Sequence, residues 1–551
     1  MSQPEPLPGS RPKTVLYRNG SVYTAADPFA TAMVVDGDTV AWVGSEQAAS
    51  SIADSSMEII DLRGALVAPG FVDSHLHLTE TGIALESLKL GGIRSARELL
   101  DAVAAAPGDG PVLGHGWDET AWVDGTLPSA EELERASAGR PVYLSRVDVH
   151  SALVSTTLAQ AAGLREMDGF DGGARVRRAA HTAARQATRR LPESMLQRHQ
   201  SRALSEAAAN GYVAVAEMGA PHIGGAEDLR LAAAWNGGGS EGAGVPEVLA
   251  YWGELALSEE HARSILEQFG FAVRGLAGDL NIDGSVGSRT AALRTGYTDA
   301  PGERGSLYLS VDEAAAHLAA CSLAGVQGGF HVIGDAGLDA ALQALGLAAR
   351  EVGEQRVRAA GHRFEHVEMA DPAAVETLAR YAVTVSAQPA FDAAWGGPGG
   401  LYEQRLGERS SSMNPFARLY SAGVPVCFGS DSPVTPLRPW SSVRACLEHH
   451  NQEERISARA AFLGHTRAGW RAARYPNPMA GQLVPGAPAS FAVWEVEELM
   501  VQVADGRVQS WSTDPRARTP LLPALDTGSD PVCLQTVRDG VELFASPALR
   551  S

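Results

Sequence analysis

The sequence predicts an α/β fold in which a distorted (β/α)8 TIM barrel carries a composite β-sandwich and a large insertion. Three patterns lead to this prediction. The middle of the chain alternates short apolar runs with Ala-, Leu- and Glu-rich stretches of helical length, which is typical of βα units. Both chain ends are rich in short apolar runs separated by turn residues. Residues from about 79 to 200 interrupt the barrel rhythm directly after the first predicted barrel strand.

The composition is that of a globular protein and limits its partners. The 551 residues are 45% hydrophobic and 20% charged, with no apolar run long enough to span a bilayer. The polar, Pro-rich segment from Met1 to Lys13 lacks the apolar core of a signal peptide. A formal net charge of −20 argues against a nucleic-acid or membrane partner. We therefore expect a cytoplasmic protein with a small-molecule substrate, and we leave homodimer formation open.

The cysteines are scattered along the chain without a paired spacing. This argues against a disulfide framework and against a zinc site built from cysteines. The four residues are Cys321, Cys427, Cys446 and Cys533.

The two chain ends are expected to form the β-sandwich together, from residues 1–66 and 484–551. Asn19-Gly20, Asp36-Gly37, Asp505-Gly506 and Asp539-Gly540 are typical hairpin turns. The apolar runs around them lie at 14–17, 21–24, 32–35, 39–43, 489–495, 498–503 and 536–544. Two separate β appendages are the alternative.

The barrel is expected between residues 67 and 483, where eight apolar runs read as strands. These runs are 67–73, 212–217, 247–252, 279–283, 326–331, 362–366, 382–387 and 424–429. Helical stretches follow several of them, at 311–324, 337–351 and 371–379. A doubly wound open sheet is the alternative, but no Gly-x-Gly-x-x-Gly motif follows the first strand. The insertion holds strands of its own at 111–116 and 141–147 and could cover an active site at the barrel mouth.

Metal-ligating residue types stand at the ends of four of these strands. His75 and His77 follow the first strand with the spacing that puts alternate side chains on one face. His331 ends the fifth strand, His366 the sixth, and Asp431 the eighth. Because the carboxyl ends of barrel strands converge on one mouth, these imidazoles and this carboxylate would meet and could hold a divalent metal. Ordinary polar residues at strand ends are the alternative for each residue taken alone.

A series of short motifs runs along most of the chain. These motifs are Pro69-Gly70-Phe71 with His75-Leu76-His77, Gly116-Trp117-Asp118 with Leu127-Pro128, Arg140-Pro141-Val142 through His150, Asp283 to Thr290, His331 to Asp335, His362 to His366, Gln388-Pro389, Leu406-Gly407 and Gly429 to Val434. They resemble the motifs of the amidohydrolase superfamily. More narrowly, the chain resembles amidohydrolase family 3, the group that contains N-substituted formamide deformylase, from about residue 14 to 545. The resemblance implies a distorted barrel with a composite β-sandwich.

The resemblance also implies roles for the residues at the strand ends. His75 and His77 would be the tighter ligand pair, and His331 and His366 would bind the same or a second ion. Asp431 would be both a ligand and the catalytic proton shuttle. Such a metal lowers the pKa of a bound water and polarises a carbonyl, while the carboxylate passes the proton from the water to the leaving nitrogen. We expect zinc, with manganese or iron as alternatives and with one or two ions.

One departure from the family pattern concerns the bridge between two metal ions. Many members of the superfamily use a carboxylated lysine on the fourth strand, where family 3 relatives often show Lys-x-x-x-Asp-Gly. Here the segment reads Asp279-Leu-Asn-Ile-Asp283-Gly, and the only lysines of the chain are Lys13 and Lys89. A lysine carbamate is therefore not expected. Either one metal suffices, or Asp279 bridges two ions; an ordinary acidic residue at a strand start is the alternative.

Five further residues are expected to shape the substrate pocket. Trp117, Asp118 and His150 lie in the insertion, Glu217 ends the second strand, and Arg289 follows a Gly-Ser-Val-Gly-Ser loop and could hold an anionic group.

The function that these observations favour is that of a metal-dependent hydrolase. It would cleave a C–N bond other than a peptide bond, in an amide, a formamide or a cyclic amide. The alternatives are a deaminase or an esterase at the same metal site, since a fold does not fix the chemistry. A non-catalytic binding protein with a vestigial site is a further alternative.

Overall fold

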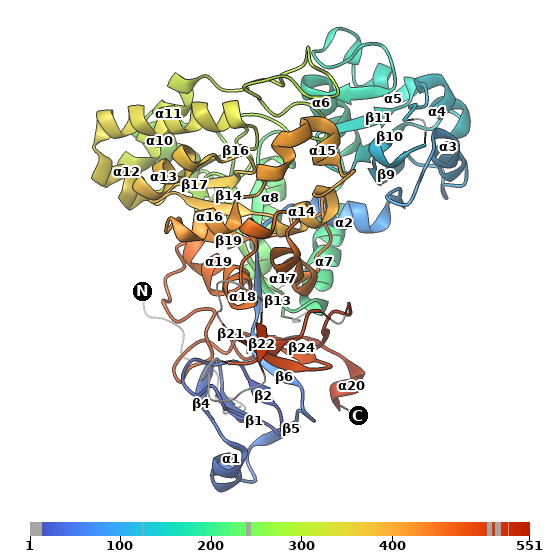
Figure 1. Ribbon diagram of the computed structural model, residues 1–551. Coiled ribbons are helices and arrows are strands. Elements are labelled where there is room, and N and C mark those ends of the chain that lie inside the picture. Colours follow the sequence, from blue (N-terminus) through green and yellow to red (C-terminus); the bar gives the residue numbers. More distant parts are fainter. Residues whose placement is uncertain are drawn as a thin grey trace.

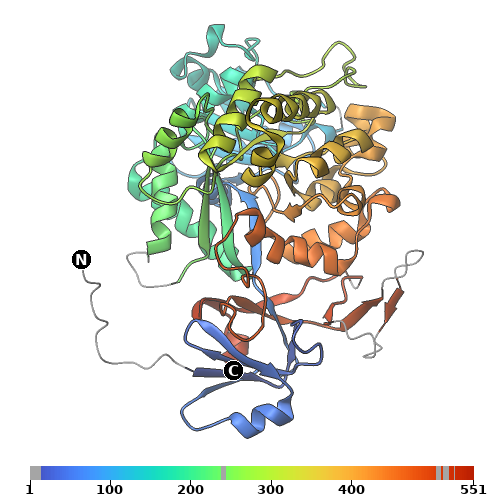
Figure 2. The same cartoon turned by 90° about the vertical axis from the view of Figure 1, so that its left-hand side faces the viewer.

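The computed structural model describes residues 14–550 apart from 124, 238–243, 504–509, 513–519 and 527 (Figure 1). The segment through Lys13 and the turn expected at Asp505-Gly506 lie outside the described residues. None of the helices that the structure describes is both long and apolar enough to cross a lipid bilayer. In Figures 1 and 2, the sheets built from the chain ends lie below the central parallel strands, and in Figure 1 the insertion lies at the upper right, beside these strands.

Eight parallel strands form two sheets at the centre, and the prediction of a mixed α/β fold is confirmed. One sheet has the order β14-β13-β7 and the other β15-β16-β17-β18-β19. A parallel bridge between Leu76 and Ser432 joins β7 to the segment after β19, and Arg274 N donates to Ala250 O at 2.8 Å between β15 and β14. The strands are β7 (Phe71–Leu76), β13 (Tyr212–Gly219), β14 (Glu247–Trp252), β15 (Gly275–Leu276), β16 (Gln327–Val332), β17 (Arg363–His366), β18 (Thr384–Ala387) and β19 (Val426–Phe428).

Two of the predicted strands differ from the structure. The run 67–73 is not one strand: Gly70 separates β6 (Leu66–Pro69) from β7, and the two strands belong to different sheets. A Cβ at Gly70 would fall 2.2 Å from the Val213 side chain, so only glycine fits this crossing. The run 279–283 is not a strand either. β15 ends at Leu276, and Asn281 makes only a single bridge to His331, so Asp279 lies on the loop beyond the strand.

Helices cover the parallel strands, and the three predicted at 311–324, 337–351 and 371–379 are present. They are α10 (Val311–Ala324), α11 (Asp335–Val352) and α13 (Pro372–Arg380). Ser310 and Glu313 form a capping box at the start of α10, and Gly325 ends it in the left-handed region. The other helices around the strands are α7 (Glu193–Ala209), α8 (Gly225–Ala234), α9 (Glu259–Glu267), α12 (Glu354–Ala360), α14 (Pro389–Trp395), α15 (Leu401–Leu406), α16 (Phe416–Ser421), α17 (Pro439–Glu448), α18 (Ala458–Gly464) and α19 (Arg467–Ala472).

The chain ends pair with each other in one sheet, of order β2-β6-β20-β24-β25, in which β6 runs antiparallel to β20. Residues 14–61 supply a second sheet, β4-β3-β1-β5, and buried side chains such as Tyr17, Val67 and Phe491 pack between the two. The strands are β1 (Thr14–Arg18), β2 (Ser21–Val22), β3 (Ala32–Asp36), β4 (Thr39–Gly44), β5 (Glu58–Asp61), β20 (Phe491–Glu495), β24 (Val532–Arg538) and β25 (Val541–Ala545). β21 (Leu499–Val503), β22 (Ser510–Ser512) and β23 (Leu522–Pro523) form a small third sheet.

The turn residues at the chain ends had mixed outcomes. Asp36-Gly37 and Asp539-Gly540 do join antiparallel strands. Asn19-Gly20 does not, because β1 and β2 lie in different sheets. The sequence interpretation also missed the helix α1 (Glu46–Ile52), whose N-terminus Ser45 caps.

The insertion folds around its own five-stranded sheet, of order β12-β11-β10-β9-β8. The strands expected at 111–116 and 141–147 are β9 (Val112–Trp117) and β10 (Val142–Arg146). The remaining strands are β8 (Leu88–Lys89), β11 (Ser151–Val154) and β12 (Arg175–Arg177). The helices are α2 (Leu78–Glu86), which leads into the insertion, α3 (Ala96–Ala104), α4 (Ala130–Ala136), α5 (Thr156–Ala161) and α6 (Arg178–Thr188).

Candidate metal centre

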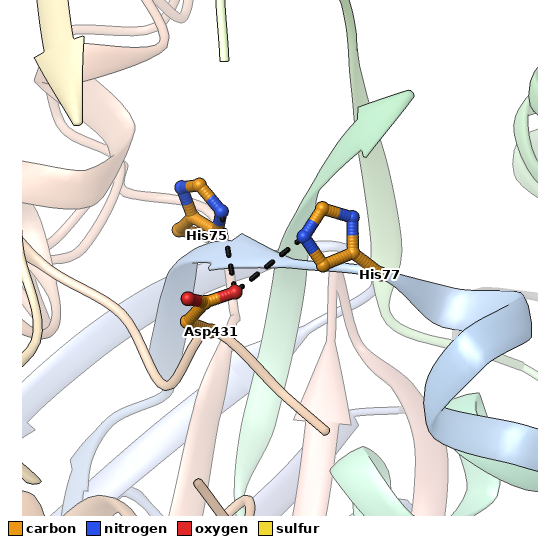
Figure 3. A group of neighbouring side chains, drawn as sticks. All are labelled: His75, His77 and Asp431. Carbon is orange, nitrogen blue, oxygen red and sulfur yellow. Dashed lines mark ion pairs between the residues drawn. The ribbon is translucent and has the colours of Figure 1, made fainter. Parts of the chain in front are cut away.

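The end of β7 is joined to the loop after β19, and this junction places Asp431 against the two histidines of the His75-Leu-His77 motif (Figure 3). Asp431 N donates to His75 O at 2.7 Å, and His77 N donates to Ser432 O at 2.9 Å. Asp431 has a φ of +53°, an uncommon conformation for a residue other than glycine. Backbone strain of this kind gathers at functional sites, where the surrounding structure holds it in place.

Two carboxylates from distant parts of the chain face both imidazoles. Asp431 Oδ1 lies 3.4 Å from His75 Nε2 and 3.4 Å from His77 Nε2. Asp279 Oδ1 lies 3.5 Å from His75 Nε2, and Asp279 Oδ2 lies 3.3 Å from His77 Nε2. Both histidines are buried, so these four side chains form a compact polar cluster at the carboxyl ends of the parallel strands.

The two later histidines lie beside this cluster. Ligand atoms of His75, Asp279 and His366 all lie within 4.8 Å of one another, as do those of His75, His77 and Asp431. The His366 ring lies 5.1 Å from the His75 ring and 4.5 Å from the His331 ring, centroid to centroid. All six residues expected to bind metal are therefore neighbours, although His331 belongs to neither of the two groups of close ligand atoms.

Hydrogen bonds to the far nitrogens fix how the imidazoles point. Glu365 Oε2 lies 2.8 Å from His75 Nδ1, and Gln388 Oε1 lies 2.7 Å from His366 Nδ1. These bonds leave the Nε2 atom of each ring free to face the cluster. Arg363 in turn pairs with Glu365, at 2.6 Å between Nε and Oε1. Such hydrogen bonds around metal-binding histidines set the tautomer and raise ligand basicity.

Burial and neighbouring charges shift the pKa values of the side chains in this site. Burial opposes ionisation of Asp279, but the hydrogen bond and charge of His77 outweigh burial and hold the Asp279 pKa well below its usual range. Burial likewise lowers the pKa of His77, yet Asp279 and Asp431 raise that pKa well above its usual value. Burial lowers the pKa of both His331 and His366, which keeps their rings neutral. A divalent cation would displace the protons that these carboxylates draw onto His77.

The residues present fit a divalent metal. His75 Nε2 and Asp279 Oδ1 are buried and accept or donate no hydrogen bond within the described part of the chain. Buried polar atoms without partners are rare, and an ion is one of the few partners that would satisfy both a ring nitrogen and a carboxylate oxygen here. Imidazole with carboxylate suits zinc, manganese and iron alike.

A third group of acidic and imidazole side chains, Asp392 with His449 and His450, differs in this respect. His450 Nδ1 is bonded to Asp392 and its Nε2 lies 3.0 Å from Ser410 O, while His449 Nε2 lies 3.0 Å from Asn414 O. Because the ring nitrogens of this group already have hydrogen-bond partners, we interpret the group as a set of structural contacts and not as a metal site.

Two cavities reach the cluster from different sides. The larger, of about 1620 Å³, lies between the insertion and the strand ends, and His77, His150 and Asp279 are part of its wall. The smaller, of about 360 Å³, is lined by His331, His366 and Asp431 together with apolar and aromatic side chains. The insertion therefore supplies one wall of the space in front of the candidate metal centre.

Of the residues expected to shape the pocket, two lie near the centre. His150 lines both cavities, and its ring lies 5.1 Å from the ring of His331. Glu217 is buried near His77 in a separate small cavity and accepts a hydrogen bond from Leu78 N at 2.6 Å, at the start of α2. Burial raises the pKa of Glu217 to about 8.

The other three are held elsewhere, and none lines either cavity. Trp117 is fully buried in the insertion, where its Nε1 donates to Leu144 O at 2.8 Å. Asp118 pairs with Arg146 at 2.6 Å, and Arg289 pairs with Asp299 at 2.6 Å.

Sequence reasoning missed two residues around the centre, Asp73 and Arg185. Asp73, two residues before His75 on β7, accepts from His75 N at 3.1 Å and from Ser430 N at 2.9 Å. Strand alternation was a signal that could have placed Asp73 on the same face. Arg185, in the larger cavity, carried no comparable signal.

Comparison with known proteins reveals relatives that match over most of the chain. Protein LONG AFTER FAR-RED 3 of Arabidopsis thaliana is 26% identical over 522 residues, covering 87% of this chain and 86% of its own. N-substituted formamide deformylase of Arthrobacter pascens is 22% identical over 468 residues, covering 78% and 83%.

A solved structure and a family model agree with these relatives. The crystal structure of an uncharacterized metal-dependent hydrolase from Pyrococcus furiosus superposes with a TM-score of 0.67 at 27% identity, covering 87% of this chain and 98% of the other. The model of the amidohydrolase family, in its family 3 form, matches residues 58–544. The chain therefore belongs to the amidohydrolase family.

Proposed function

We propose that this protein is a metal-dependent hydrolase that cleaves the C–N bond of a small amide, formamide or cyclic amide. The observation that carries the proposal is the meeting of His75, His77, Asp279 and Asp431 beside an open cavity, around buried atoms that have no hydrogen-bond partner among the described residues. The N-substituted formamide deformylase among the relatives supports the choice of a C–N bond.

In the architecture that we propose, the two parallel sheets form the distorted barrel of residues 67–483, with the insertion at about 79–200. Residues 1–66 and 484–551 form the composite β-sandwich. The bridge from Leu76 to Ser432 and the hydrogen bond from Arg274 to Ala250 support closure of the barrel, since they link the two sheets at both edges. Catalytic residues in such barrels come from the carboxyl ends of several strands.

We assign the metal ligands to His75, His77, His331, His366, Asp279 and Asp431. Asp279 takes the place that a carboxylated lysine has in many relatives, and its ligand atom lies within 4.8 Å of those of both His75 and His366. This supports Asp279 as the ligand that would be shared if two ions bind. Lys89 is engaged elsewhere, because its Nζ donates to Ala84 O at 2.5 Å. We expect zinc, with manganese or iron as the alternatives, and one or two ions.

In the mechanism that we propose, a divalent metal, when bound, lowers the pKa of water and polarises the substrate carbonyl. Asp431 accepts the proton of the attacking water on a carboxylate oxygen and passes it to the leaving nitrogen. Glu365 and Gln388 hold the rings of His75 and His366 in the tautomer that presents Nε2 to the site. The insertion limits access of bulk water to the centre.

The proposal is tested by replacing Asp431 with asparagine. We expect turnover to fall by at least about 100-fold, the lower range for loss of a general base, while bound metal is retained. Turnover is followed as amine, ammonia and acid release on a panel of amides and esters, and metal by elemental analysis. Asp339→Asn, a half-exposed carboxylate paired with Arg294, is the matched control. Unchanged turnover in Asp431→Asn would remove Asp431 from the mechanism, and ester cleavage without amide cleavage would overturn the choice of bond.

We also infer a small-molecule substrate, because the candidate metal centre opens onto a cavity within the protein. The cytoplasmic location and the homodimer stay predictions.

A further inference from the structure

Arg185 lies in the larger cavity with an incomplete set of partners. The residue is on α6 of the insertion and is only 9% exposed. Its Nη2 donates to His222 O at 2.8 Å, but its buried Nε has no hydrogen-bond partner in the part of the chain that the structure describes. Among the described residues, no carboxylate oxygen lies within 4.0 Å of its guanidinium nitrogens. A buried charge of this kind is costly unless a partner compensates it.

The other charged side chains of this cavity are already compensated. Glu80 is held by Arg189 through two hydrogen bonds of 2.7 Å, and Arg178 pairs with Asp168 at 2.8 Å. The remaining carboxylate in the wall is Asp279, which belongs to the candidate metal centre. Arg185 is therefore the one charged side chain of the described cavity wall that has no ion-pair partner among the described residues.

The imidazoles around Arg185 do not compete for that partner. Burial, with the charge of Arg185 adding to it, lowers the pKa of His222 to about 4 and lowers that of His181 well below its usual value. Both rings are therefore neutral near pH 7. A single guanidinium beside neutral rings suits one anionic group rather than a polyanion, and its planar fork matches a carboxylate.

We propose that Arg185 binds a carboxylate group of the substrate. This inference rests on the proposed function, because the same cavity also opens onto His77 and Asp279 of the candidate metal centre. The substrate class is then an amide that carries a carboxylate near the scissile bond, such as an N-acylated amino acid. The carboxylate would lie against the insertion while the amide lies at the strand ends.

The test compares matched substrates that differ only in this charge. Metal-loaded protein is assayed on N-formyl-, N-acetyl- and N-benzoyl-amino acids and on the corresponding neutral carboxamides. We expect kcat/KM to favour the carboxylates by about 10- to 100-fold, the value of a charged hydrogen bond. Arg185→Gln should lose this preference, Arg185→Lys should keep part of it, and Arg263→Gln, an exposed arginine paired with Glu259, should keep all of it.

A binding measurement separates this inference from the proposed function. Thermal stabilisation by N-benzoylglycine and by N-benzoylglycinamide is compared in wild type and in the three variants, which reports binding and does not depend on turnover. We expect the acid to stabilise wild type more than the amide does, and Arg185→Gln to remove the difference. Hydrolysis of amides without a charge preference, or a preference that survives in Arg185→Gln, would overturn the role of Arg185. Preferential binding without any hydrolysis would instead overturn the proposed function.

Discussion

Replacing Glu365 with glutamine tests how the His75 ring is held in the candidate metal centre. Glu365 is fully buried and contacts His75 Nδ1 at 2.8 Å and Arg363 Nε at 2.6 Å. Burial opposes its ionisation, but Arg363 outweighs burial and lowers the Glu365 pKa to about 2. The side chain is therefore a carboxylate at neutral pH, and glutamine removes one charge with little change in shape.

The structure predicts two separate consequences. Arg363 is also fully buried, so Glu365→Gln leaves a buried charge without its ion-pair partner, which costs about 3–5 kcal/mol of the free energy of unfolding. The imidazole also loses the charged acceptor that sets its tautomer and basicity, and a change of this kind lowers metal affinity about 10- to 100-fold.

A double variant separates these two consequences. Arg363→Met combined with Glu365→Gln removes both charges, so most of the lost stability should return while metal affinity stays low. Stability is measured by denaturant unfolding of chelator-treated protein, and metal affinity by competition with a chromogenic chelator. If the double variant recovers wild-type metal affinity, Glu365 acts only through the fold, and the proposed orientation of His75 is wrong.

Two further variants test the junction at β7 and the walls of the cavity. Gly429→Ala would place a Cβ 2.5 Å from His75 N. We therefore expect the free energy of unfolding to fall by about 1–3 kcal/mol and the metal content to decrease. An unchanged melting temperature with full metal occupancy would contradict the close approach. Burial opposes ionisation of Glu80, but Arg189 outweighs burial and lowers the Glu80 pKa from 4.5 to about 2. The ion pair therefore contributes fully to the free energy of unfolding above about pH 4.5, and this contribution is lost as the pH falls toward 2. The unfolding free energy of wild type should then fall more steeply than that of Glu80→Gln between about pH 5 and pH 2, by up to about 3 kcal/mol in total. Parallel pH profiles would refute the assignment.

The strand ends were the most predictable part of the site. Parallel strands bring their carboxyl ends to one edge, so a histidine or aspartate after an apolar run can be placed without knowing any side-chain contact. This logic brought His75, His77, His366 and Asp431 together. It did not extend to Asp279, which was expected there only from the resemblance to the family pattern. The predicted strand 279–283 would begin at Asp279, whereas β15 ends at Leu276 and Asp279 lies on the loop beyond it.

Residues whose partners come from tertiary packing could not be predicted in the same way. Asp118 and Arg289 are charged residues within family motifs, yet each pairs with a neighbour outside the two cavities. Arg185 shows the reverse case. Only the folded insertion places Arg185 opposite the strand ends, where none of the described residues gives it a carboxylate partner. Gly70 likewise breaks an apolar run that reads as one strand, and the crossing at Val213 that demands glycine is visible only in three dimensions.

The most direct test of the metal centre is anomalous X-ray diffraction from crystals of the gently purified protein. Data collected on both sides of the zinc, manganese and iron absorption edges would identify and locate any bound ion. We expect an anomalous peak between His75 Nε2, His77 Nε2 and the carboxylates of Asp279 and Asp431, at ligand distances of about 2.0–2.2 Å. Crystals that show no peak at this cluster, even after soaking with each of the three metals, would contradict the proposed metal centre.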